Sequence, residues 1–226
     1  MDFPEIELKV VRMHWMENVD PYADCCVHGG IYLRFGQRVV SDGKDTWTVS
    51  TAAFNFLRTV FNDHRVGIDG DEALIPCCGF NMWPIEASPD GLCIPNCNNG
   101  IDWSVSHEQG NVIKHTFPDA EMVFTKRDEW ASAVCLFADG IFEFLKTAWP
   151  KVVQDDEDRR GFELFMKLWQ ERRLAAESIN ASRKYDYFSP RVLVVFKKPR
   201  SDRFFGKRPV IASPSRNRRA DRRFER

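Results

Sequence analysis

The chain has 226 residues, of which 43% are hydrophobic, and a formal net charge of −1. With 18 Phe and 7 Trp it is too apolar for a disordered chain, and it is long enough for one sizeable core. No run of 18 apolar residues is present, so the sequence predicts no membrane association. The start, MDFPEIELKVV, lacks the basic and apolar regions of a signal peptide, which predicts a cytoplasmic protein.

The near-zero net charge hides two oppositely charged parts. Residues 183–226 contain 15 basic residues (Lys and Arg) and 4 acidic residues (Asp and Glu), a net charge of +11. Residues 1–182 contain 17 basic and 29 acidic residues, a net charge of −12. We therefore expect an acidic globular domain over residues 1–182. The basic C-terminal extension over residues 183–226 is expected to be a flexible tail, largely disordered after about residue 197.

Strands are predicted first along the chain. Apolar and charged residues alternate over residues 6–10, as in a half-buried strand, and the change of phase between Val10 and Val11 indicates a bulge or the strand's end. A second alternating run, residues 31–35, follows Gly29 and Gly30, which are interpreted as breakers.

The middle of the chain predicts a helix and further strands. Ser50 is a candidate N-cap for a helix over about residues 51–63. A short buried strand is expected at residues 73–78, followed by an irregular segment rich in Gly, Pro and Asn up to residue 100. Two alternating runs within residues 101–117 then predict a β-hairpin whose Trp103 enters the core. Short strands are also expected at EMVFT (121–125) and PRVLVVF (190–196).

Two amphipathic helices follow. Thr125 and Asp128 resemble a capping box for a helix that runs to about residue 148, and Pro150 marks its end. The acidic run that begins at Asp155 opens the next helix, where negative charge favours the helix dipole. The predicted class is therefore α+β, with a mostly antiparallel sheet packed by two or three amphipathic helices.

The cysteines are the first candidates for chemistry. Zinc requires about four soft ligands, and one region provides four thiols: Cys77, Cys78, Cys93 and Cys97. Their spacing differs from a standard zinc knuckle, so the alternative is a set of reduced, mostly buried thiols and no cofactor. A cysteine nucleophile would need a nearby histidine (His28, His64 or His107) and an acid such as Asp63 or Asp102, which only the fold can bring together. No decisive catalytic motif is present, and a non-enzymatic protein is predicted.

Acidic clusters are the leading candidates for partner binding, because complementary charge speeds association with a basic protein. The residues concerned are Asp63, Asp69, Asp71, Glu72, Asp155, Asp156 and Glu157. The alternative interpretation is a solvated surface with helix capping. In the tail, an Arg-rich segment is a candidate for nucleic-acid binding through phosphate contacts; it contains Arg216, Arg218, Arg219, Arg222 and Arg223. The alternative interpretation is a solubilising tail, or one that folds back on the acidic domain.

Several segments together resemble small bacterial proteins that act as immunity partners of polymorphic toxins. These segments are HGGIYLRFG (28–36), WTVSTAAFNFLRTVFNDH (47–64), LIPCCGF (74–80), CNNGIDWSVSHE (97–108), EWASAVCLFADGIFEFLKTAWPK (129–151) and DDEDRRGFELFMKLWQERR (155–173). The resemblance covers roughly residues 20–175 and excludes the tail. It implies a protein that neutralises a cationic toxin by occlusion. The alternatives are a zinc- or thiol-dependent enzyme and a nucleic-acid-associated protein that acts through the tail.

Overall fold

The computed structural model describes residues 3–67, 73–79, 81–86, 90–95, 97 and 99–180. Over these residues the chain forms three antiparallel sheets and three α-helices, which confirms the predicted α+β class. None of the described helices combines the length and apolar composition needed to cross a bilayer. The predicted domain boundary after residue 182, the tail and the strand at 190–196 lie outside the described residues.

The largest sheet is built around one buried central strand, β2. β2 pairs with β1 along one edge, while β3 and β4 pair with successive parts of its other edge, all antiparallel. The β1–β2 register shifts between Val10 and Arg12, so the predicted phase change is a bulge that leaves Val11 exposed. The strands are β1 (Ile6–His14), β2 (His28–Phe35), β3 (Arg38–Asp42) and β4 (Trp47–Thr48).

Gly29 and Gly30 belong to β2, so their interpretation as breakers is wrong. A Cβ atom on Gly29 would lie 2.0 Å from the carbonyl oxygen of Arg12, and one on Gly30 would lie 2.4 Å from that of Gly43. The two glycines let neighbouring backbone approach β2 at the point where β1 and the β3–β4 connection both cover it.

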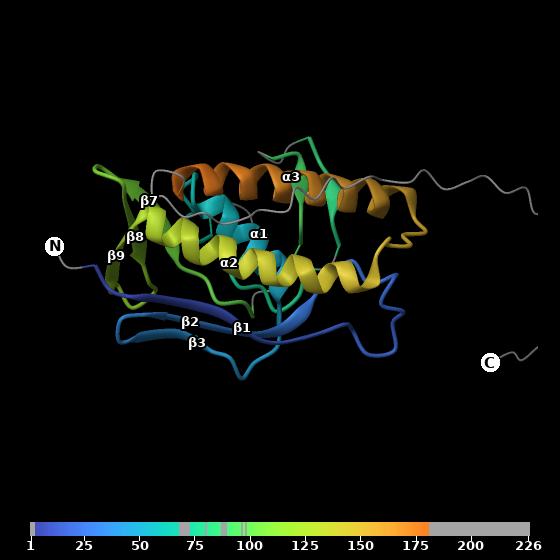
Figure 1. The fold of residues 1–226 in the computed structure, drawn as a ribbon, viewed down its shortest axis with the longest axis horizontal. Helices are drawn as coiled ribbons and strands as arrows, with labels where there is room; N and C mark the ends of the chain where they lie inside the picture. Colours follow the sequence, from blue (N-terminus) through green and yellow to red (C-terminus); the bar gives the residue numbers. More distant parts are fainter. Residues whose placement is uncertain are drawn as a thin grey trace, which may run out of the picture. The chain divides into compact units, whose positions relative to one another are not determined.

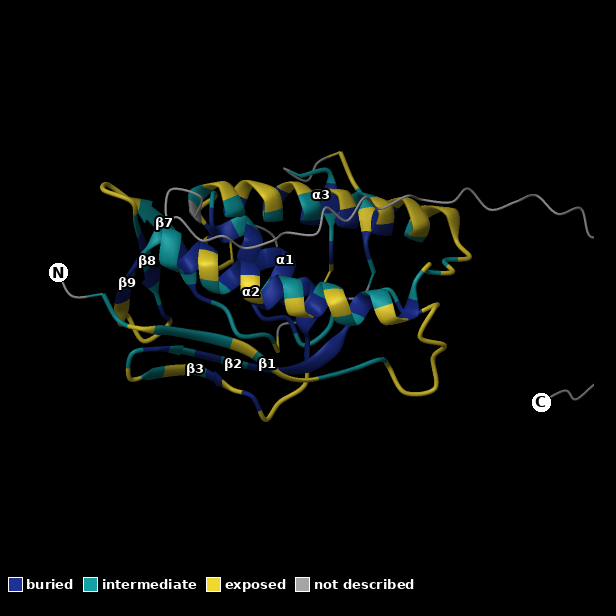
Figure 2. Cartoon of the chain, viewed as in Figure 1, coloured by how far each residue is buried: buried dark blue, intermediate teal, exposed yellow. Residues whose placement is uncertain are grey.

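Three helices lie on one side of this sheet (Figure 1). They are α1 (Val49–Thr59), α2 (Arg127–Leu145), which continues as a 3-10 turn over Lys146–Ala148, and α3 (Asp156–Asn180). α2 packs against β1, α1 and α3, so it occupies the middle of the structure. Figure 2 shows that the buried residues line the contact between the helices and β2, and that the exposed stripe of α3 faces outward.

The first two helices begin differently from the prediction. α1 starts at Val49, directly after β4, and Ser50 lies inside it, where its hydroxyl oxygen accepts a hydrogen bond from the Val27 amide (3.1 Å). α2 starts at Arg127 without a side-chain cap, because the hydroxyl of Thr125 is bonded to His115 within the core. Both predicted caps are therefore wrong, because each hydroxyl forms a hydrogen bond with a residue distant in sequence.

The remaining strands form two small sheets. The predicted hairpin at 101–117 is confirmed, and the next strand extends it to three: β7 (Ser104–Glu108), β8 (Val112–Thr116) and β9 (Met122–Lys126). β5 (Trp83–Pro84) and β6 (Leu92–Cys93) form a short ladder beside α3, within the segment expected to be irregular. The strand predicted at 73–78 is only a single antiparallel bridge, from Ile75 to Ile101.

An aromatic cluster joins these elements at the centre of the core. Trp103 and Trp130 are both 0% exposed, as the sequence predicted for Trp103. Phe56 of α1 contacts both indole rings, at centroid distances of 5.9 and 5.6 Å. Phe35 of β2 lies 4.7 Å from His115 and 5.9 Å from Trp130. The cluster thus connects both larger sheets with α1 and α2.

We predict opposite effects for two helix glycines. A Cβ atom on Gly161 of α3 would lie 1.6 Å from the carbonyl oxygen of Met82, so Gly161→Ala should lower the free energy of unfolding by about 1–3 kcal/mol. Gly140 of α2 is exposed with nothing within 4 Å, so Gly140→Ala should raise it by up to about 1 kcal/mol. Urea unfolding measures the free energy of unfolding of both variants. Equal changes in the two variants would contradict the close contact of α3 with Met82.

We also predict acid sensitivity from His115. Burial lowers the pKa of His115 to about 3, whereas the unfolded chain has the ordinary value of 6.5. Between pH 6.5 and pH 3 the imidazole of His115 is protonated in the unfolded state but neutral in the folded state. The contribution of the neutral imidazole to the free energy of unfolding is therefore complete above pH 6.5 and is lost as pH falls. Urea unfolding between pH 7 and 5 should show a decline steeper in the wild type than in His115→Gln by up to about 1.4 kcal/mol per pH unit. Parallel declines would contradict a buried neutral imidazole.

Candidate functional site

Two segments far apart in sequence meet at the end of the structure where α3 begins. The Val152 amide donates a hydrogen bond to the carbonyl oxygen of Tyr22 (2.8 Å). Lys151 Nζ donates to the carbonyl oxygen of Pro21 (2.8 Å) and lies 3.7 Å from the centroid of the Trp15 ring. Burial lowers the pKa of Lys151 to about 8. The loop at 16–25 is therefore fixed against the segment that leads into α3.

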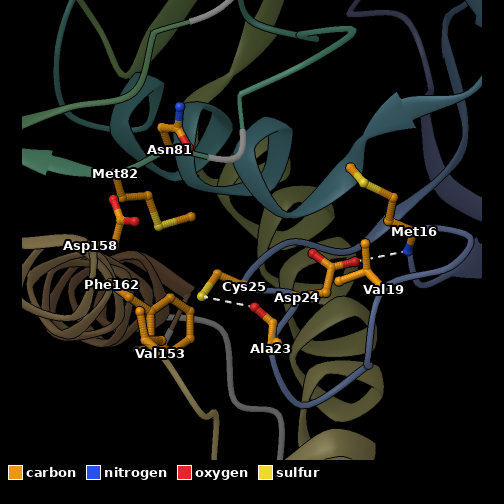
Figure 3. Close-up of a pocket in the computed structure, with 10 residues that line it drawn as sticks. All are labelled: Met16, Val19, Ala23, Asp24, Cys25, Asn81, Met82, Val153, Asp158 and Phe162. Atoms are coloured by element: carbon orange, nitrogen blue, oxygen red, sulfur yellow. Dashed lines mark hydrogen bonds between the residues drawn. The ribbon is translucent and has the colours of Figure 1, made fainter. Parts of the chain in front are cut away.

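A pocket of about 250 Å³ opens between these segments and residues 81–82 (Figure 3). This volume is below the roughly 300–1,000 Å³ typical of small-molecule sites and suits a single inserted side chain. The walls are mainly apolar, with carboxyl groups from the loop and from α3. The lining residues are Met16, Val19, Ala23, Asp24, Cys25, Asn81, Met82, Val153, Asp158 and Phe162.

Asp24 and Cys25 provide the polar atoms on the loop side. The buried carboxylate of Asp24 accepts hydrogen bonds from the amides of Met16 (2.8 Å) and Cys26 (3.0 Å), and these bonds hold the loop closed. Burial raises the pKa of the Cys25 thiol to about 11, so the thiol stays protonated at neutral pH. Cys25 is therefore suited to lining the pocket and is a poor nucleophile.

Further carboxylates flank the pocket in both segments. The loop at 16–25 contains three acidic residues and no basic one, and residues 151–160 contain four acidic residues, one lysine and two arginines, a net of −1. Glu17 and Asp20 are exposed on the loop, while Asp156 and Glu157 are exposed in the first turn of α3. Asp156 also forms an ion pair with Arg159 (2.8 Å). Negative charge is thus concentrated beside an apolar cavity.

Asp155 has a structural role in this region. Its Oδ1 accepts hydrogen bonds from the amides of Glu157 (2.8 Å) and Asp158 (3.1 Å), which otherwise lack partners in the first helical turn. These two bonds lower the pKa of Asp155. Of the predicted set, Asp156 and Glu157 are left to present charge at the surface.

Asp63 lies elsewhere and is engaged within the fold. Its Oδ1 accepts hydrogen bonds from the amide (2.9 Å) and Nδ1 (2.8 Å) of His107 in β7, and the side-chain bond lowers the pKa of Asp63. The other members of that predicted cluster, Asp69, Asp71 and Glu72, lie outside the described residues, as does the Arg-rich segment from Arg216 to Arg223.

The structure brings three of the four predicted metal-ligand cysteines together. The Sγ atoms of Cys77, Cys78 and Cys97 all lie within 4.8 Å of one another, whereas Cys93 lies in β6 and is not part of this group. Cys77 and Cys97 are 2.7 Å apart, and their hydrogen bond lowers the pKa of Cys97 to about 7 and raises that of Cys77 to about 12. All three thiols are half-buried.

Of the three histidines considered for a cysteine enzyme, His64 and His107 pair with aspartates as structural contacts, whereas His28 Nε2 lies 3.9 Å from Asp24 and has no hydrogen bond among the described residues. His64 is buried; its Nε2 is 2.8 Å from Asp102 and its Nδ1 is 3.3 Å from Arg58. His107 is bonded through Nδ1 to Asp63 and through Nε2 to the carbonyl oxygen of Val60 (3.2 Å). Because both ring nitrogens of His64 and of His107 have partners, neither of these two rings is free to activate a thiol.

We predict that Asp155 and Asp156 contribute differently to stability. Asp155→Ala removes the acceptor for two helix amides and should lower the midpoint of thermal unfolding, while Asp155→Asn retains an acceptor and should recover most of the loss. Asp156→Ala removes only an exposed ion pair and should change the midpoint little. Equal effects of the two alanine variants would contradict the capping role.

The comparisons with known proteins add no assignment. No protein-family model, curated protein or solved structure matches the chain. The candidate site therefore rests on the geometry of the chain's own residues: an apolar pocket lined by residues 81–82 and by two segments that both carry excess negative charge.

Proposed function

We propose that this protein is a non-enzymatic binding protein that holds a basic protein partner at the pocket between the 16–25 loop and the start of α3. The observation that supports this most is the coincidence of an apolar cavity with net negative charge on two of the segments that line it, the 16–25 loop and residues 151–160. Interfaces commonly bind one anchor side chain in such a cavity, while surrounding charges guide association.

The anchor that fits best is long, partly apolar and cationic. Val19, Met82 and Phe162 offer apolar contact to its stem, and Asp24 and Asp158 offer carboxylate oxygens to its charged end. An arginine or lysine side chain has this character, because its methylene groups bury well while its head keeps polar partners.

The specific form of the proposal is that the partner is a cationic bacterial toxin and that this chain acts as its immunity protein. The acidic net charge of residues 1–182 supports this form, because charge complementarity gives the fast association that neutralisation requires. The described residues would act by covering the toxin, with no chemical step of their own.

The test compares two bait proteins in extracts of the native host at low salt. We expect the wild-type full chain to enrich one basic protein, and Ala23→Phe, which fills the pocket from an exposed position, to lose it. With the purified partner, this variant should bind about 30-fold more weakly. Recovery of the same protein by both baits, or of no basic protein, would count against the proposal.

Charge is tested separately by two double variants that remove the same net charge. Asp156→Asn with Glu157→Gln should weaken binding about two- to tenfold and reduce its salt dependence. Glu108→Gln with Asp119→Asn, at the β7–β9 end, is the control and should bind as the wild type does. The toxin version also requires that the captured partner be harmful when expressed without this chain and harmless with it.

A further inference from the structure

The three-cysteine cluster shares no residue with the lining of the proposed binding pocket. It is formed by two parts of the chain, residues 73–79 on one side and residues 97 and 99–101 on the other, which are joined by an antiparallel bridge between Ile75 and Ile101. The amides of Ile75 and Ile101 each donate to the other's carbonyl oxygen, at 3.0 and 2.9 Å. This pair of bonds sets Cys77 and Cys78 opposite Cys97.

The backbone around Cys77 and Cys78 is anchored to the core. The carbonyl oxygen of Pro76 accepts a hydrogen bond from the Thr48 amide (3.0 Å), and that of Gly79 accepts one from the Thr51 hydroxyl (2.8 Å). On the opposite segment, a Cβ atom on Gly100 would lie 2.8 Å from the carbonyl oxygen of Ile75, so glycine permits the close approach. The sulfur positions are therefore fixed by packed structure on the Cys77–Cys78 side.

We propose that Cys77, Cys78 and Cys97 bind one zinc ion, with the fourth position taken by solvent. In a tetrahedral zinc site with Zn–S bonds of about 2.3 Å, ligand sulfurs lie roughly 3.8 Å apart. All three sulfurs lie within 4.8 Å of one another, and the Cys77–Cys97 pair, now 2.7 Å apart, would have to separate by about 1 Å to reach this spacing. Zinc with three protein ligands commonly retains such an exchangeable position.

The ligand set favours zinc over the harder divalent cations. Three sulfur donors suit zinc, whereas magnesium and calcium prefer oxygen. The Cys97 amide also donates to Cys78 Sγ (3.0 Å), and an amide bond of this kind stabilises a negatively charged thiolate ligand.

A zinc ion here would close the chain between Cys78 and Cys97. That interval contains β5 and β6, which contact α3, and Met82, which lines the pocket. The carbonyl oxygen of Met82 also approaches Gly161 of α3 closely. The metal would thus join the two ends of a segment whose described residues form one short ladder, β5–β6, and it would stabilise the folded chain because the unfolded chain lacks the site.

The test uses the full-length chain, reduced, freed of metal by a chelator and kept anaerobic. Titration with Zn²⁺ should show one tightly bound ion per chain and a higher thermal midpoint. Co²⁺ should give the visible absorption of a tetrahedral thiolate site. Binding should weaken about 100-fold or more in Cys97→Ser and in Cys78→Ser.

Two matched variants serve as controls. Cys25→Ser removes a half-buried thiol outside the cluster and should leave zinc affinity unchanged. Cys93→Ser should do the same if the fourth position belongs to solvent. The proposal would be overturned if the reduced wild type bound less than one zinc ion per chain. It would also be overturned if Cys97→Ser bound zinc with the same affinity as the wild type. So would a thiol assay that finds all three cluster cysteines equally reactive with and without Zn²⁺.

Discussion

Burial of two indole rings is the constraint on which the rest of this fold depends. Trp103 and Trp130 are fully enclosed, so each ring N–H must find a partner inside the core. Trp103 donates to Nδ1 of His115 (3.1 Å), whose Nε2 is bonded to the Thr125 hydroxyl (3.1 Å). Trp130 donates to the Thr59 hydroxyl at the end of α1 (3.0 Å). These bonds connect β8, β9, α1 and α2, and they set where the helices lie on the sheet.

This core also explains where the candidate site is. The two tryptophans are fully buried and Trp130 lies near the start of α2, while the far end of α2 leads through Pro150 into a mostly exposed segment. There, Lys151 and Val152 form hydrogen bonds with the 16–25 loop, and the pocket lies beside this contact. The rigid centre therefore positions a more open, acidic end, the usual division between a scaffold and a binding surface.

The sequence predicted the elements better than their ends. Periodicity located β1, β2, the β7–β8 hairpin and the last two helices because their burial patterns are regular. The caps were predicted wrongly, because the local sequence does not reveal that the Ser50 hydroxyl is bonded to the Val27 amide or that the Thr125 hydroxyl is bonded to His115. Gly29 and Gly30 were misread for the same reason, because the neighbouring backbone that requires glycine comes from distant residues.

The site could be predicted only in part. The acidic run at Asp155 and the thiols were visible as residue types, but their distances depend on contacts such as Ile75 with Ile101. The pocket was missed: its loop, NVDPYADCC, reads as turn-forming, and the only local signal was exposed apolar residues such as Val19 and Tyr22 among acids. Pairing of this loop with residues 151–152 is a tertiary event without a sequence signature.

The central claim is that the acidic end at the pocket is the surface that meets a basic protein. Carbodiimide cross-linking tests it directly, because the reagent joins carboxylates to lysine amines that are already in contact. The full chain, mixed with host extract at low salt, should give cross-links from Glu17, Asp20, Asp156 or Glu157 to one basic protein, identified by mass spectrometry. Cross-links confined to the β7–β9 end, at Glu108, Asp119 or Glu121, would contradict the claim.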